Sequence, residues 1–172
     1  EPRKDLPGLV RAFSAVAARH PEVSLVLAGP PGWGEEPLAA AVAASPARER
    51  IVRTGWVEDA DLAALLARAS VLAYPSLYEG FGFPPLQAMA AGVPVVATRA
   101  GSLPEVLGDG ALWVEPGDVD ALAGALASCL EDDALRDRLV AVGRERSGDY
   151  SWERCAAGLA SLYYDAAGSR GA

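Results

Sequence analysis

The sequence predicts an α/β fold, a doubly wound parallel sheet with helices on both faces. Short β-branched runs alternate with helical patterns along the chain, which is the rhythm of right-handed βαβ units. Hydrophobic residues make up 51% of the 172 residues, enough to fill a core between helices and a buried sheet. Glycine- and proline-rich loops separate these runs, as expected between short elements.

Strands are predicted where apolar and β-branched residues run together. In chain order they are residues 23–28, 51–54, 71–74, 94–98 and 111–114. The first run is almost continuously apolar, so we expect it to be buried on both faces. Ligands of such sheets bind at the carboxyl ends of the strands, so the loops that follow these strands are where a site is expected.

Helices are predicted from apolar residues at helical spacing and from residues that begin or end helices. Residues 6–19 carry such a face, which Pro21 ends. Pro84 and Pro85 suit the first turn of a helix that runs to about residue 91. The remaining predicted helices are 37–44, 59–69, 104–107, 118–130, 132–147 and 151–167, before a frayed tail at 168–172.

The length fits one domain that spans residues 1–172. Doubly wound sheets usually begin with a central strand, whereas this chain opens on a loop and a helix. Either the first strand lies before Glu1 or another element supplies it, and we favour the first alternative.

Charge and composition exclude several classes of function. The net charge of −8 is unsuited to nucleic acid, which requires a basic face. No apolar run is long enough for a transmembrane segment. Cys129 and Cys155 lack metal-ligand spacing, and we expect both to be reduced, partly buried thiols of a cytoplasmic protein.

The strongest candidate site lies in residues 74–98, which read YPSLYEGFGFPPLQAMAAGVPVVAT. Gly80 and Gly82 allow positive φ and bring backbone N–H groups close to a ligand. The next helix points its positive dipole end at the same space, which suits a diphosphate. Glu79 would repel a phosphate and is better matched to sugar hydroxyls, while Gln87 can donate and accept hydrogen bonds. On the glycines alone, a simple turn with Glu79 as a solvated charge is as good an interpretation as a ligand site.

The chain resembles the C-terminal domain of group 1 (family four) retaining glycosyltransferases, which have the two-domain GT-B architecture. The matches run through nearly the whole chain in the right order. They are Glu1-Pro2-Arg3-Lys4, residues 23–29, Gly55-Trp56-Val57, Pro75-Ser76, residues 79–83, residues 88–96, Gly101 and Pro104-Glu105. The resemblance implies a Rossmann-like domain that is one half of a GT-B enzyme.

The resemblance also implies a reaction. The domain would bind a UDP- or GDP-hexose and, with an N-terminal acceptor domain of the same polypeptide, transfer the glycosyl group with retention to an acceptor hydroxyl. The family needs no metal or cofactor. This chain alone is expected to be inactive, and the enzyme to be cytoplasmic, with peripheral membrane association through the other domain left open.

Three residues acquire catalytic roles from the resemblance. Glu79 matches the glutamate that touches the donor sugar, and Arg3 and Lys4 match the basic pair beside the donor diphosphate. Cations at that place would stabilise charge on the leaving group. Without the resemblance, Arg3 and Lys4 read as a frayed, solvated N-terminus.

The donor-binding residues that the resemblance implies are Val57, Gly80, Phe81, Gly82, Phe83 and Gln87. Val57 would contact the nucleobase, whereas Trp56 is expected to be a partly buried packing residue. Gln87 stands where the family has a glutamate for the ribose hydroxyls, and a neutral amide binds them less strongly than a carboxylate. Two alternatives remain open, a non-catalytic nucleotide-binding module and a GT-B epimerase or phosphorylase.

Overall fold

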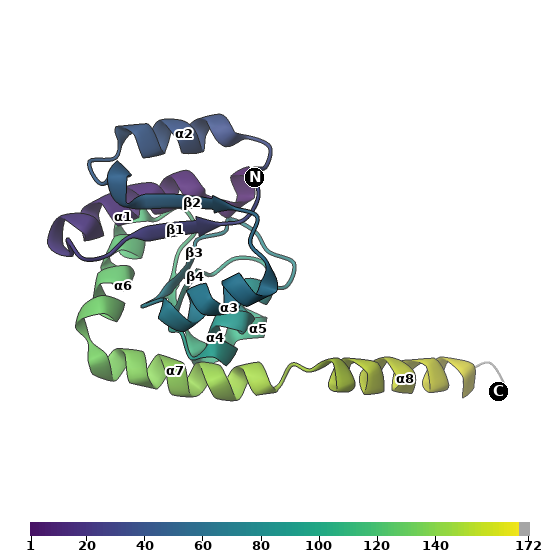
Figure 1. The fold of residues 1–172 in the computed structure, drawn as a ribbon. Coiled ribbons are helices and arrows are strands. Elements are labelled where there is room, and N and C mark those ends of the chain that lie inside the picture. The colour runs from purple at the N-terminus through teal and green to yellow at the C-terminus, as the bar shows by residue number, and fades with distance from the viewer. Residues whose placement is uncertain (169–172) are drawn as a thin grey trace.

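The computed structural model describes residues 1–168 (Figure 1). The strands are β1 (Leu25–Ala28), β2 (Ile51–Gly55), β3 (Leu72–Tyr74), β4 (Val95–Thr98) and β5 (Ala111–Val114). The α-helices are α1 (Leu6–Arg19), α2 (Glu35–Ala44), α3 (Asp59–Arg68), α4 (Phe83–Ala91), α5 (Leu103–Leu107), α6 (Val119–Glu131), α7 (Asp133–Gly148) and α8 (Trp152–Gly168), and the 3-10 turns are η1 (Pro2–Lys4), η2 (Arg48–Arg50) and η3 (Gly108–Gly110).

These elements confirm the predicted α/β class, and their boundaries differ from the predicted ones by at most two residues. The helix α1 begins where Asp5 caps it, because the Asp5 side chain accepts a hydrogen bond from the Gly8 backbone. The tail predicted to fray, 168–172, lies outside the described residues except for Gly168, which ends α8.

Every strand pair is parallel, but the hydrogen bonds form two sheets. One sheet has the order β1-β2 and the other the order β3-β4-β5. Within residues 1–168, no ladder joins β1 to β3. The single continuous sheet that the sequence suggests is therefore divided into a β1-β2 part and a β3-β4-β5 part.

Helix α1 connects the two sheets through side chains. Leu9 and Val16 belong to one apolar cluster with Val96 of β4, and Leu25 and Leu27 of β1 pack against the same cluster. Helices α6 and α2 both pack beside α1, as Figure 1 shows. Side-chain packing therefore holds the two sheets together, because no backbone hydrogen-bond ladder joins them within the described residues.

The prediction that the first strand is buried on both faces is wrong. Burial in β1 alternates, and Val26 remains 41% exposed. Helix α1 covers the face that carries Leu25, while Val26 points to the opposite face, as does its register partner Val52. Complete burial occurs in β4, which lies between two strands and beneath helices.

The last helix, α8, extends away from the rest of the chain (Figure 1) and has no buried residue. Cys155 on α8 is consequently exposed, so the prediction of a partly buried thiol is wrong for this residue, whereas Cys129 is fully buried in α6. No helix within residues 1–168 has the length and apolar character needed to cross a bilayer.

Candidate functional site

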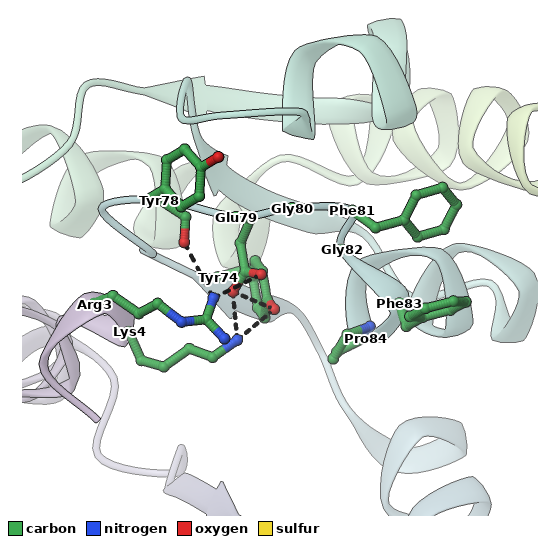
Figure 2. Close-up of a pocket in the computed structure, with 10 residues that line it drawn as sticks. All are labelled: Arg3, Lys4, Tyr74, Tyr78, Glu79, Gly80, Phe81, Gly82, Phe83 and Pro84. Carbon is green, nitrogen blue, oxygen red and sulfur yellow. Dashed lines mark hydrogen bonds and ion pairs between the residues drawn. The ribbon is translucent and has the colours of Figure 1, made fainter. Parts of the chain in front are cut away.

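A pocket of about 620 Å³ opens at the carboxyl end of β3. Its volume is in the range of small-molecule sites. Figure 2 shows the ten residues that line it, which come from η1, the end of β3, the loop after β3 and the first turn of α4. They are Arg3, Lys4, Tyr74, Tyr78, Glu79, Gly80, Phe81, Gly82, Phe83 and Pro84.

The turn at Asp5 directs the two cations of η1 into this pocket. Asp5 has φ 45°, a left-handed conformation that non-glycine residues rarely adopt. Its side chain caps α1, which compensates for this conformation. The carbonyl of Arg3 accepts a hydrogen bond of 2.7 Å from the Leu77 backbone, so the segment is fixed against the loop after β3. The N-terminal segment is therefore ordered rather than frayed.

Glu79 is the centre of the polar contacts in the pocket (Figure 2), although its side chain is only 8% exposed. Tyr74 donates to its Oε1 at 2.8 Å, and Ser76 donates to the same oxygen at 3.1 Å. Lys4 Nζ also pairs with Oε1, while a guanidinium nitrogen of Arg3 lies 2.9 Å from Oε2. One carboxylate is thus surrounded by two cations and two hydroxyls.

These donors keep Glu79 ionised. Burial of the carboxylate opposes ionisation, but hydrogen bonds from Lys4, Tyr74 and Arg3 outweigh it and lower the pKa of Glu79 to about 2. The Tyr74 hydroxyl is affected in the opposite direction, because burial and its bond to Glu79 raise the pKa of Tyr74. At neutral pH the pocket therefore holds an anion, two cations and a neutral phenol that donates.

Backbone contacts fix the loop that carries Glu79. The Glu79 carbonyl accepts hydrogen bonds from the Ser102 backbone at 3.0 Å and the Ser102 hydroxyl at 3.2 Å. Gly101 has φ 55°, and a Cβ there would collide with the same carbonyl. Gly82 has φ 102° and forms the N-cap of α4, so the positive end of that helix faces the loop; in its first turn only Phe83 carries a backbone N–H, because the next two residues are Pro84 and Pro85.

Gly80 departs from expectation. It is not among the glycines of positive φ, so its backbone conformation does not require glycine. A Cβ at Gly80 would meet no atom within 4 Å, although the residue lines the pocket. The missing side chain therefore leaves open space beside Glu79 that a ligand can use.

The aromatic residues of the loop pack against each other. The ring centroids of Phe81 and Phe83 are 4.7 Å apart, and the Phe81 ring meets Tyr150 edge-on at 5.6 Å. Figure 2 shows both phenylalanine rings turned away from the Glu79 carboxylate. Their side chains support the loop, which leaves its backbone to face the pocket.

The structure thus brings together seven of the residues singled out by sequence, namely Arg3, Lys4, Glu79, Gly80, Phe81, Gly82 and Phe83. The other two, Val57 and Gln87, do not line this pocket. Val57 follows β2 and is half-buried, and Gln87 is exposed on α4. Their ligand contacts stay predictions.

Sequence reasoning missed the role of Tyr74 and Ser102 and treated Trp56 incorrectly. Tyr74 was assigned only to a strand, although an aromatic hydroxyl at the carboxyl end of a strand is a plausible site group. Trp56 was expected to be partly buried, but it is 71% exposed and donates to Glu58 at 3.2 Å.

Among residues 1–168, no group of three or more acidic, histidine or cysteine side chains is arranged to hold a metal.

The family model described as "Glycosyl transferases group 1" matches residues 1–146. O-antigen chain mannosyltransferase B of Escherichia coli is 40% identical over 167 residues, which are 95% of this chain and 43% of that protein. MMP alpha-(1->4)-mannosyltransferase of Mycolicibacterium hassiacum is 41% identical over 168 residues, 94% of this chain and 40% of that protein.

Solved structures show the same similarity. Sucrose-phosphate synthase from Thermosynechococcus elongatus has a TM-score of 0.83 and 30% identity, over 98% of this chain and 44% of that chain. HepE from Anabaena, solved in complex with UDP, has a TM-score of 0.81 and 25% identity, over 94% of this chain and 46% of that chain. The chain spans less than half the length of these relatives.

Proposed function

The chain belongs to the group 1 glycosyl transferases, and we propose that it binds a nucleoside diphosphate sugar as the donor of a glycosyl transfer reaction. The observation that carries this proposal is the meeting of Arg3, Lys4 and Glu79 in one pocket beside the N-terminus of α4. Two cations and a helix N-terminus suit a diphosphate, and a buried carboxylate suits sugar hydroxyls.

The donor would lie across the carboxyl ends of the strands. Its diphosphate meets Arg3, Lys4 and the backbone near Gly82, and its sugar occupies the space beside Gly80 and Glu79. The nucleoside then extends toward the loop after β2, where Val57 contacts the base, and Gln87 meets the ribose. Binding by Gln87 lacks the strength that a charged acceptor would add.

In the reaction, Arg3 and Lys4 stabilise the negative charge that builds on the leaving nucleoside diphosphate. These cations and the helix dipole replace a metal ion in that role, so transfer is metal-independent. The donor is a UDP- or GDP-hexose, and mannose is the first sugar to test because the E. coli and Mycolicibacterium relatives are named mannosyltransferases.

The proposal extends to the whole polypeptide. Residues 1–172 form the donor-binding domain, and an N-terminal domain of the same polypeptide supplies the acceptor site, with transfer that retains the anomeric configuration. A cytoplasmic location agrees with the two unpaired cysteines. Transfer by the 172-residue chain alone would contradict the assignment of the acceptor site to another domain.

Titration calorimetry with UDP, GDP, UDP-glucose and GDP-mannose tests donor binding. We expect at least one nucleotide sugar to bind, and Arg3→Gln or Lys4→Gln to weaken it by at least about tenfold, the effect of losing a hydrogen bond to a charged group. Arg11→Gln, which changes an exposed arginine on α1, is the matched control. If none of the four nucleotides binds, the proposed function is wrong.

An assay of sugar transfer by the polypeptide with its acceptor domain separates an enzyme from a non-catalytic module. Release of nucleoside diphosphate and a new glycosidic product are expected with one of the two donors. Nucleotide binding without turnover over a broad panel of acceptors would favour the module.

A further inference from the structure

The groups that a donor diphosphate would use are already engaged with one another. Lys4 and Arg3 both pair with the Glu79 carboxylate, one on each oxygen. Under the proposed function the same two cations bind the diphosphate. An incoming ligand therefore competes with Glu79 for Arg3 and Lys4.

This competition has a defined electrostatic consequence. The Glu79 side chain is only 8% exposed while it is paired with the two cations, and once they turn away its uncompensated charge faces an incoming phosphate. A bare nucleoside diphosphate carries more negative charge than the same diphosphate esterified to a sugar. The repulsion from Glu79 is therefore greater for the bare nucleotide.

Two hydroxyls remain with Glu79 when the cations leave. Tyr74 and Ser76 both donate to Oε1, and both are buried within or directly after β3. The Tyr74 hydroxyl also lies 2.7 Å from Lys4 Nζ, so it touches both members of the ion pair. The tyrosine is thus a buried support, whereas the Arg3 side chain is 41% exposed and would exchange its contacts with Glu1, Glu79 and the Tyr78 carbonyl for a ligand.

We propose that Glu79 makes this pocket select nucleoside diphosphate sugars over bare nucleoside diphosphates, with Tyr74 as the residue that positions its carboxylate. Either ligand displaces Glu79 from Arg3 and Lys4, but only the sugar returns hydroxyl donors to the carboxylate. After transfer the sugar is gone, and Glu79 takes back its cations, which promotes release of the nucleoside diphosphate. This inference rests on the proposed function.

The principal test compares Glu79→Gln with the unmodified chain by calorimetry, using UDP and UDP-glucose, and GDP and GDP-mannose. The variant should bind the bare nucleotide at least about threefold more tightly, because the carboxylate no longer competes for Arg3 and Lys4. It should bind the nucleotide sugar at least about tenfold more weakly, because hydroxyl bonds to a charged acceptor are lost. Glu145→Gln, an exposed carboxylate on α7, should change neither affinity.

Tyr74→Phe tests the positioning role. This variant should have a smaller preference for the nucleotide sugar over the bare nucleotide. As pH falls, the remaining preference should disappear at a higher pH than in the unmodified chain. The ionisable groups that face Glu79 are Arg3 and Lys4 from η1 and Tyr74 from β3, and loss of the phenol lets the Glu79 pKa rise. Tyr164→Phe on the exposed helix α8 is the control.

The outcomes separate the two proposals. If no nucleotide binds the unmodified chain, the proposed function fails. If nucleotides bind but Glu79→Gln weakens bare and sugar-linked nucleotides equally, the selectivity of Glu79 is refuted while the donor site stands. If Tyr74→Phe lowers both affinities equally with no change in their pH dependence, the tyrosine is structural only.

Discussion

Acid should destabilise this chain in part through Glu79, which is the buried carboxylate of the pocket. Glu79 has a pKa of about 2 in the folded chain, against an ordinary value of 4.5. This difference corresponds to about 3 kcal/mol of folding free energy, at about 1.4 kcal/mol for each pH unit. Because the pKa of the folded state is the lower one, the stabilisation is present above pH 4.5 and is lost as pH falls toward 2.

The Glu79→Gln variant isolates this contribution, since glutamine is close in shape to the protonated acid. Urea denaturation at a series of pH values should find the variant less stable by up to about 3 kcal/mol at pH 7, with the difference shrinking below pH 4.5. Glu145→Gln, at an exposed position of α7, is the matched control. A difference between Glu79→Gln and the unmodified chain that stays constant from pH 7 to pH 3 would refute the reasoning.

Three further changes test other parts of the site. Gly80→Ala should leave the melting temperature unchanged or slightly raised, because its Cβ meets no protein atom within 4 Å. It should weaken nucleotide-sugar binding in calorimetry, because the Cβ occupies the open space beside Glu79. Gly124→Ala in α6 is the control. Asp5→Ala should lower the free energy of unfolding in urea by about 1 to 2 kcal/mol, because it removes the cap of α1. Gln87→Glu should tighten UDP or GDP binding severalfold, and unchanged affinity would remove this residue from the site.

Local signals explain why the secondary structure could be predicted closely. Pro21 follows the end of α1 within two residues, and Pro84 and Pro85 lie in the first turn of α4. Glycine at position 82 likewise anticipates a positive φ. Such features depend on neighbours in the chain, which the sequence presents directly.

The contacts of Glu79 could not be derived in the same way. Lys4 meets Glu79 across 75 positions, and only the packing of η1 against the loop after β3 brings them together. The resemblance assigned both residues to one site but did not indicate their ion pair or the hydroxyl of Tyr74. The exposure of Trp56 and of Val26 was missed for a related reason, because apolar character alone does not show which face a helix covers.

The break in hydrogen bonding between β1 and β3 bears on how a ligand would act on the chain. A nucleoside near Val57 lies on the β1-β2 side, whereas a sugar near Glu79 lies on the β3-β4-β5 side. Within residues 1–168 these sides are joined by side-chain packing around α1 and by no backbone ladder. A bound donor would therefore contact both sheets at once. A nucleotide sugar should rigidify the chain more than the nucleotide alone or the sugar alone.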